Sequence, residues 1–227
     1  MGVKQFLKEN TALLEKLFHM YSVLLGVNKI KGKAGNQLIA EGAFLKRCRI
    51  QINGTNNQIV VKDLARLQNC MIYIQGNGNQ IHIGKSVSLN YAELWIEDND
   101  NRLQIEDGSS ADGKKQAPVH MAVIEGNRII LGKDCMLSSG IEIRTGDSHS
   151  IVNNEGERIN PSKEIVVGNH VWIGTRAMLL KGSRIADDCI VGAGSMVTGS
   201  FDEAGCALAG NPAKVLRKDV SWKRERI

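Results

Sequence analysis

An aliphatic residue returns every six residues, six times in succession, within the stretch that begins at Val167 and ends at Thr198. The repeated positions are Val167, Ile173, Leu179, Ile185, Val191 and Val197. Four residues after each of the first five stands a small or slim side chain, at Val171, Ala177, Ser183, Cys189 and Ser195. Neither the helical period nor the alternation of an ordinary strand produces this pattern. A period of six is typical of a parallel β-helix, in which each hexad forms one flat side of a coil and turns its aliphatic residue inward.

A longer repeat precedes the hexads. An Asn followed two residues later by an aliphatic side chain recurs at Asn36, Asn57, Asn79, Asn101 and Asn127. We expect the Asn and Gly clusters of this half to mark corners, because both residue types tolerate a positive φ. The sequence therefore predicts an all-β protein, a parallel β-helix solenoid of about nine coils over residues 32–205. Two loops interrupt the repeat, at about 108–121 and 150–164, and insertions on the outside of a solenoid usually carry function.

The two ends of the chain differ from the repeat. Residues 1–31 predict an amphipathic α-helical cap, because the open end of a solenoid must be covered. Residues 206–227 form a short segment rich in Lys and Arg. The five cysteines are interpreted as small core residues in a reducing compartment. With no signal peptide and no apolar run of membrane length, we expect a cytoplasmic protein, and the amphipathic N-terminus leaves membrane association open.

Four segments resemble the hexapeptide-repeat acyltransferases, in particular the O-acetyltransferases that act on sugars, xenobiotics and surface polysaccharides. They are Arg-Thr-Gly-Asp-Ser-His-Ser from Arg144, Val-Gly-Asn-His-Val-Trp-Ile-Gly from Val167, Val-Gly-Ala-Gly-Ser from Val191 and Gly-Asn-Pro-Ala-Lys-Val-Leu-Arg from Gly210. Together they cover about 131–217 in the family's order, whereas residues 1–80 match no family. The resemblance implies a left-handed β-helix, a homotrimer with active sites between neighbouring subunits, and acetyl-CoA as co-substrate.

The resemblance also assigns the catalytic residue. His149 matches the family's catalytic histidine and stands at the mouth of the longer loop, where a neutral imidazole can take the proton of an attacking hydroxyl. Asp147 either fixes the imidazole tautomer, as in a catalytic triad, or caps a corner. His120, in the other loop, is a candidate for binding the acceptor. Trp172 either walls the acetyl pocket or packs against a loop, and His170 beside it is interpreted as pointing outward.

Coenzyme A is expected along the C-terminal coils. Carried over one by one, the family's contacts fall on Thr175, Ala193, Thr198, Gly199, Lys214 and Arg217. Lys214 and Arg217 would meet the phosphates, because clustered cations suit a polyanionic cofactor. The family often has Lys where Gly199 stands, so one phosphate contact is either missing or supplied by Lys218.

Other functions were weighed against this one. A zinc enzyme on the same fold needs two histidines a few residues apart, and the spacing of His82, His120, His149 and His170 provides no such pair. Nucleic-acid binding is disfavoured, because the basic cluster is short and lacks interleaved aromatic residues. An N-acetyltransferase acting on an amino sugar and a non-catalytic scaffold remain open. The sequence therefore predicts an acetyl-CoA-dependent O-acetyltransferase of polysaccharide biosynthesis, with direct transfer to a sugar hydroxyl and no metal.

Overall fold

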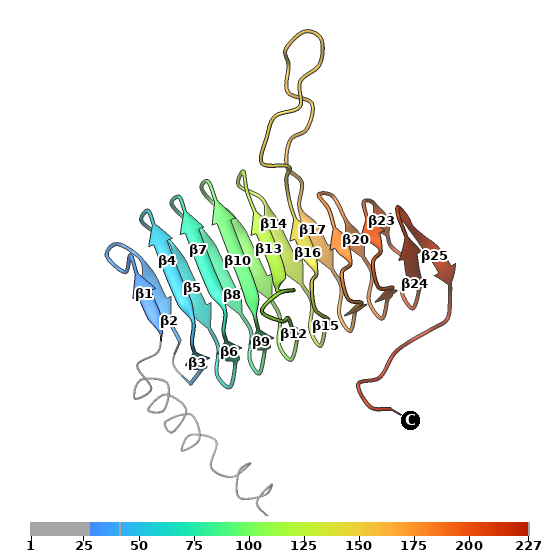
Figure 1. The fold of residues 1–227 in the computed structure, drawn as a ribbon, viewed down its shortest axis with the longest axis horizontal. Coiled ribbons are helices and arrows are strands. Elements are labelled where there is room, and N and C mark those ends of the chain that lie inside the picture. Colours follow the sequence, from blue (N-terminus) through green and yellow to red (C-terminus); the bar gives the residue numbers. More distant parts are fainter. Residues whose placement is uncertain (1–27, 41, 227) are drawn as a thin grey trace, which may run out of the picture.

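The computed structural model describes residues 28–40 and 42–226, so the predicted helical cap falls almost wholly outside the described residues. Within these ranges the chain winds as a parallel β-solenoid and contains no helix (Figure 1). Successive strands belong in turn to three sheets, which we name A, B and C. Each strand pairs with the equivalent strand of the next coil. Sheets A and B each hold 8 strands, so the solenoid has about eight coils, one fewer than the sequence predicted.

The strands are short, and they shorten further toward the C-terminus as the hexads take over. Sheet A consists of β1 (Lys29–Lys31), β4 (Arg49–Asn53), β7 (Met71–Gln75), β10 (Ala92–Glu97), β13 (Val119–Val123), β16 (Glu142–Arg144), β19 (Met178–Leu179) and β22 (Met196–Val197). Sheet B consists of β2 (Gln37–Ile39), β5 (Gln58–Val61), β8 (Gln80–Ile83), β11 (Arg102–Ile105), β14 (Arg128–Leu131), β17 (Ile165–Val167), β20 (Arg184–Ile185) and β23 (Ser200–Phe201).

Sheet C has 9 strands, because the chain adds one more at its end. It consists of β3 (Phe44–Lys46), β6 (Arg66–Gln68), β9 (Ser88–Asn90), β12 (Ser110–Asp112), β15 (Met136–Leu137), β18 (Trp172–Ile173), β21 (Ile190–Val191), β24 (Ala207–Gly210) and β25 (Ala213–Arg217). Strand β25 turns back and pairs antiparallel with β24, whereas all other pairs are parallel. The solenoid strands thus begin at Lys29 and run to Arg217.

The inward positions of the hexads are buried as the sequence predicted. All six aliphatic positions from Val167 to Val197 are at most 3% exposed, and so are the five small positions from Val171 to Ser195. The interior is a single core of Ile, Leu, Val, Ala and Cys side chains that runs through all coils. All five cysteines are free and buried in it, as small core residues. Burial raises the pKa of the Cys135 thiol to about 11, so this thiol stays protonated at neutral pH.

The repeated Asn residues lie at one corner of the coil, as expected, but they act there through hydrogen bonds rather than through a positive φ. Asn57, Asn79 and Asn101 are buried, and each donates its backbone N–H and its side-chain amide to the side-chain oxygen of the preceding Asn. They form a ladder of side-chain amides along one corner, which satisfies polar groups that would otherwise be buried unpaired. The positive φ belongs to other residues of these clusters, among them Asn56 and Gly76, and at Gly76 an added Cβ would lie 1.9 Å from the carbonyl oxygen of Asp98.

The two predicted loops are not equivalent. Residues 108–121 include β12 and the start of β13, and the extra chain between these two strands is a small turn closed by a bridge between Lys114 and Ala117. The other insertion, between β16 and β17, stands out from the solenoid as a long loop (Figure 1). Only this second loop is therefore large enough to add a surface to the coil.

Candidate active site

The loop between β16 and β17 carries His149 at its base. It leaves sheet A at Thr145, which is buried, and re-enters sheet B at Ile165. Its two arms pair through a bridge between Val152 and Arg158, so it is a hairpin rather than an irregular excursion. His149 is exposed, and within the described part of the chain its ring makes no hydrogen bond. The imidazole is therefore available to a molecule that binds there.

Asn160 holds the two arms of this loop together. Its side chain lies in the loop yet is only 6% exposed, so its polar atoms bond within the protein rather than to water. The amide nitrogen donates to the carbonyl oxygen of His149 and to Oδ2 of Asp147, both at 2.8 Å. Its oxygen accepts from the N–H of Ile151 at 2.7 Å. The backbone on both sides of His149 is thus fixed by one buried side chain.

The carboxylate of Asp147 contacts Lys181 and Asn160. Its Oδ2 forms an ion pair with Lys181 and accepts the hydrogen bond from Asn160. The Lys181 ammonium first, and the Asn160 amide second, hold the pKa of Asp147 below its usual range. Among the described residues Asp147 makes no hydrogen bond with the His149 ring, and the choice between the two roles that the sequence left open stays a prediction. Lys181 lies on the next coil, so this ion pair ties the loop to the solenoid.

A second ion pair anchors the far arm of the loop. Arg158 donates from Nη2 to Oε1 of Glu125 at 2.6 Å, and Glu125 accepts the backbone N–H of Ser162 at 3.1 Å. The hydrogen bond from Arg158 lowers the pKa of Glu125. Glu125 belongs to the preceding coil, so the loop is fastened to the coils on both sides of its origin.

His120 does not lie in a loop, contrary to the sequence prediction. It is the second residue of β13 and points outward from sheet A, because its neighbours Val119 and Met121 are fully buried. Its Nδ1 lies 2.9 Å from Oε1 of Glu142 on the adjacent strand β16. The same strand leads into the loop that carries His149, so His120 still lies beside that loop, but on the face of a sheet.

Trp172 lies far from His149, at the start of β18 in sheet C. It contacts Trp222 of the C-terminal segment, with ring centroids 6.3 Å apart. Trp222 also stacks on His170 at 4.2 Å and donates its indole N–H to the carbonyl oxygen of His170 at 2.8 Å. His170 binds Asp134 through Nδ1 at 2.7 Å. Within one chain, Trp172 and His170 therefore serve to dock the C-terminal segment on the solenoid.

Three of the expected coenzyme A contacts gather at the corner where the chain passes from sheet C to sheet A. Thr175 and Ala193 occupy equivalent places in successive coils, and the carbonyl of Thr175 accepts the N–H of Gly194 at 2.8 Å. Lys214 lies beside this corner, because it pairs with Ala209 near the end of β24. Thr198 and Gly199 lie instead at the corner between sheets A and B, two coils beyond His149.

A bulge in the last strand pair places the two expected phosphate ligands on one side. Lys214 and Arg217 would face opposite sides of a regular strand, because side chains alternate. The register of β25 shifts so that Lys214 pairs with Ala209 and Arg217 with Ala207. The extra residue is Leu216, which is 70% exposed. Both cations therefore point outward from the same face of sheet C, an arrangement that the spacing alone did not predict.

The expected site residues thus occupy three surfaces of one chain. His149, Thr198 and Gly199 lie at the corner between sheets A and B, and His120 lies on the adjoining outer face of sheet A. Thr175, Ala193 and Lys214 lie at the corner between sheets C and A, whereas Trp172 and Arg217 lie on sheet C itself. In a coil with three sides, the corner between A and B is opposite sheet C. One chain therefore does not bring His149 and Trp172 together.

Sequence reasoning missed Asn160 and Lys181. Both act on the loop through contacts made across 13 and 34 residues of sequence. Lys181 occupies, in the coil after the loop, the same corner as the base of the loop, so the hexad register could have pointed to it. Nothing in the sequence of a polar loop distinguishes Asn160 from Asn153 or Asn154.

The described residues contain neither a cluster of metal-binding side chains nor a membrane-spanning helix. Among residues 28–40 and 42–226, no three His, Cys, Asp or Glu side chains come together as they would to hold a metal ion. In the same part of the chain, no helix is long and apolar enough to cross a membrane.

Comparison with known proteins gives the family context of this geometry. Residues 164–199 match the family described as bacterial transferase hexapeptide (six repeats). The resemblance to the hexapeptide-repeat acyltransferases is confirmed. Over 106 residues the chain is 34% identical to the polysialic acid O-acetyltransferase of Neisseria meningitidis. The aligned residues are 46% of this chain and 49% of that relative.

Two further matches point to the same class of protein. A polysialic acid O-acetyltransferase of Escherichia coli O1:K1 / APEC is 31% identical over 97 residues, which is 42% of this chain and 31% of that relative. The chain thus spans about half, or less, of the length of these curated relatives. The crystallographic structure of the polysialic acid O-acetyltransferase OatWY matches 88% of this chain and 92% of its own, with a TM-score of 0.79 and 29% identity.

Proposed function

We propose that this protein is an acetyl-CoA-dependent O-acetyltransferase whose acceptor is a hydroxyl group of a polysaccharide. The observation that carries the proposal is the placement of His149, an exposed histidine at the base of a loop whose backbone is fixed by buried Asn160. The similarity to polysialic acid O-acetyltransferases supports the reaction class and makes an acidic polysaccharide the first acceptor to test.

The reaction needs one proton acceptor. As the acceptor oxygen attacks the carbonyl carbon of the thioester, a ring nitrogen of His149 takes the hydroxyl proton. The tetrahedral intermediate collapses, the carbon–sulfur bond breaks, and the imidazolium returns the proton to the departing sulfur. No covalent enzyme intermediate is needed. Backbone N–H groups at a coil edge would stabilise the oxyanion.

Coenzyme A is proposed to lie along the C-terminal coils, where Thr175 and Ala193 line a corner and Lys214 and Arg217 share one face. Two cations on one face suit the phosphate groups better than two on opposite faces. Thr198 and Gly199 would meet the cofactor from the other corner. At Gly199 an added Cβ would meet nothing within 4 Å, so a Lys side chain, common in the family, would fit there.

We further propose that the coil is left-handed and that the protein is a cytoplasmic homotrimer. The separation of His149 from Trp172 and Arg217 within one chain supports this assembly. A neighbouring copy could present its sheet C to the corner between sheets A and B and complete the site. Trp172 would then wall the acetyl pocket only if the contact with Trp222 leaves one ring face free.

The first experiment measures acetyl transfer from acetyl-CoA to an oligosialic acid. We expect His149→Ala to lower kcat by about 10²- to 10⁴-fold with an unchanged coenzyme A affinity. His82→Ala is the matched control, because it removes a histidine from the outer face of β8, away from the loop. An unchanged rate in His149→Ala would refute the assignment of the base and favour a non-catalytic scaffold.

The second experiment needs no acceptor. Calorimetric titration of coenzyme A should give micromolar binding that the double variant Lys214→Ala/Arg217→Ala weakens about tenfold, or about 1.4 kcal/mol. Lack of binding at millimolar coenzyme A would count against any acetyl-CoA-dependent activity. Transfer to an amino sugar in preference to a hydroxyl would identify an N-acetyltransferase instead.

A further inference from the structure

The outer face of sheet A carries a row of residues aligned across five neighbouring strands. Strand register places them side by side in the order Gln51, Tyr73, Trp95, Ala122 and Arg144. By strand alternation all five lie on the outer face, because their neighbours in each strand are buried, and Ala122 itself is only 5% exposed. The row ends at Arg144, the last residue of β16, from which the loop with His149 departs.

The centre of the row is a pair of stacked rings. Tyr73 and Trp95 have centroids 4.2 Å apart and planes inclined by 26°. The indole N–H of Trp95 donates to Glu97 at 2.7 Å, and the hydroxyl of Tyr73 donates to Gln75 at 2.6 Å. Both rings are partly exposed although their polar atoms are bound within the protein. The pair therefore offers a rigid, flat apolar surface, which contacts the C–H face of a sugar ring at little cost in conformational entropy.

On the side of the loop that carries His149, a small side chain follows the two rings. Ala122 lies between Trp95 and Arg144, so a methyl group stands between two of the largest side chains. Arg144 Nε lies 3.4 Å from Oε1 of Glu142 as an ion pair without the geometry of a hydrogen bond, and one of its terminal nitrogens donates to the hydroxyl of Ser148 at 3.4 Å. Ser148 is the residue before His149. A ligand that extends from the two rings past Ala122 would therefore meet the guanidinium of Arg144 and, beyond it, the proposed base.

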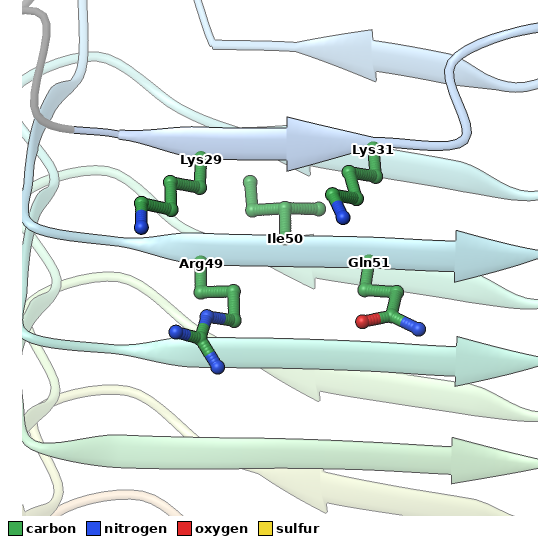
Figure 2. A pocket seen from close by; sticks show the side chains of 5 residues that line it. All are labelled: Lys29, Lys31, Arg49, Ile50 and Gln51. Atoms are coloured by element: carbon green, nitrogen blue, oxygen red, sulfur yellow. The ribbon is translucent and has the colours of Figure 1, made fainter.

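The other end of sheet A holds a basic hollow of about 260 Å³ on β1 and β4. Figure 2 shows Lys29 beside Arg49 and Lys31 beside Gln51, with side chains projecting from adjacent strands. None of the three cations forms an ion pair with any residue that the structure describes, and all three are solvent-accessible. Cations without protein partners suit carboxylates of an incoming molecule.

We propose that the outer face of sheet A is the binding track for an extended acidic polysaccharide, which stacks on Tyr73 and Trp95 and places carboxylates at Arg144 and at Lys29, Lys31 and Arg49. This inference rests on the proposed function and specifies where its acceptor lies. The track passes five strand spacings from β1 to β16, or about 24 Å at about 4.8 Å each. A polymer can span it, whereas a single sugar can occupy only one part.

The acidic residues of the same face are compatible with this occupant. Glu142 is paired with His120 and with Arg144, and Glu97 is bound by the indole of Trp95. Glu93 stands in the neighbouring row, in register with His120. The carboxylates thus flank the middle of the track, where the contact is apolar, and the cations occupy its ends.

Binding of an oligosialic acid in the absence of acetyl-CoA tests the track. We expect Trp95→Ala and, separately, Lys29→Ala/Arg49→Ala each to weaken binding about tenfold, or about 1.4 kcal/mol, without changing the affinity for sialic acid monomer. The charge-matched control is Lys85→Ala/Arg102→Ala, which removes two cations from the first residues after β8 and the start of β11, away from sheet A. Unchanged coenzyme A binding shows that each variant is folded.

The outcomes separate the two proposals. Equal loss of affinity in the Lys29/Arg49 and Lys85/Arg102 variants, or no loss in Trp95→Ala, would overturn the track even if acetyl transfer proceeds. Binding that depends on the track, with no acetyl transfer by the unaltered protein, would keep the track and refute the proposed function. If the oligosialic acid binds no more tightly than the sialic acid monomer, that result would also overturn the track.

Discussion

Asn160 is a buried polar residue in an otherwise exposed loop, and its importance follows from what it would leave unpaired. Replacement by Ala removes the partner of the Ile151 N–H, the His149 carbonyl and Asp147. We expect Asn160→Ala to lower kcat of acetyl transfer by about 10- to 100-fold, because a small misplacement of the base is costly. The effect should be much smaller once His149 is already Ala, which a double-mutant cycle would measure.

Asn153→Ala is the matched control for this prediction. Asn153 lies in the same loop and bonds to Glu157, but it is not buried among the partners of His149. Its replacement should leave kcat unchanged. Equal losses of activity in the two variants would mean that the loop as a whole, and not the fixed backbone at His149, determines the rate.

At the scale of single residues the sequence indicated candidates but not their contacts. His149 and Asp147 were selected because a motif places both at the mouth of an insertion, and their roles stay predictions. The partner of Asp147 was not found, since Lys181 reaches it from the next coil. His120 was assigned to a loop because the extra residues of its coil come just before it, whereas the strand resumes at Val119. Local sequence shows that a coil is longer, but not where the added residues leave the sheet.

At the scale of elements, we expect the attachment of the segment after β25 to depend on pH. Burial by itself lowers the pKa of His170, but the Asp134 carboxylate and the Trp222 carbonyl raise it more, so it lies above the ordinary value. A raised pKa gives stabilisation that is complete below about pH 6.5 and is lost as pH rises through the folded-state pKa. The segment should therefore detach more readily at alkaline than at mildly acidic pH.

Asp134 sets the acidic limit of the pH range in which the segment stays attached. Burial raises the pKa of Asp134, but Arg224 and His170 lower it more, so this carboxylate stabilises the segment above its ordinary pKa and ceases to do so in acid. Fluorescence of Trp222, taken as the difference between the unaltered protein and Trp222→Phe, should report both limits. In His170→Asn the alkaline transition should vanish, and its persistence would show that another group controls docking.

The elements also show how far periodicity extends. The hexads predicted every inward side chain from Val167 to Val197, because a single aliphatic position per side leaves no choice of register. The coil count was less certain, since strands of three to six residues in the first half do not repeat a fixed number of positions. The antiparallel turn of β25 and its bulge have no periodic signal, so the shared face of Lys214 and Arg217 could be found only in the structure.

For the whole molecule, the ladder of Asn side chains links the coils that carry the acceptor track to each other. Each coil of a solenoid contacts only its neighbours, so its stability is a sum of coil and interface contributions. Asn79 is fully buried and bonds to the coils on both sides through Asn57 and Asn101. Asn36 is the first rung that the structure describes, and among the described residues it bonds to one Asn of the ladder, Asn57.

Replacing one rung should therefore cost more in the middle than at the end. Asn79→Ala leaves the backbone N–H of Asn101 and the carbonyl of Asp98 without a partner, which we expect to lower the free energy of unfolding by at least about 2 kcal/mol. Asn36→Ala should cost less than about half as much, because water can replace its partners. Denaturant unfolding followed by circular dichroism gives both values. If the end rung costs as much as the central one, the Asn ladder acts through local turn geometry rather than through coupling between coils.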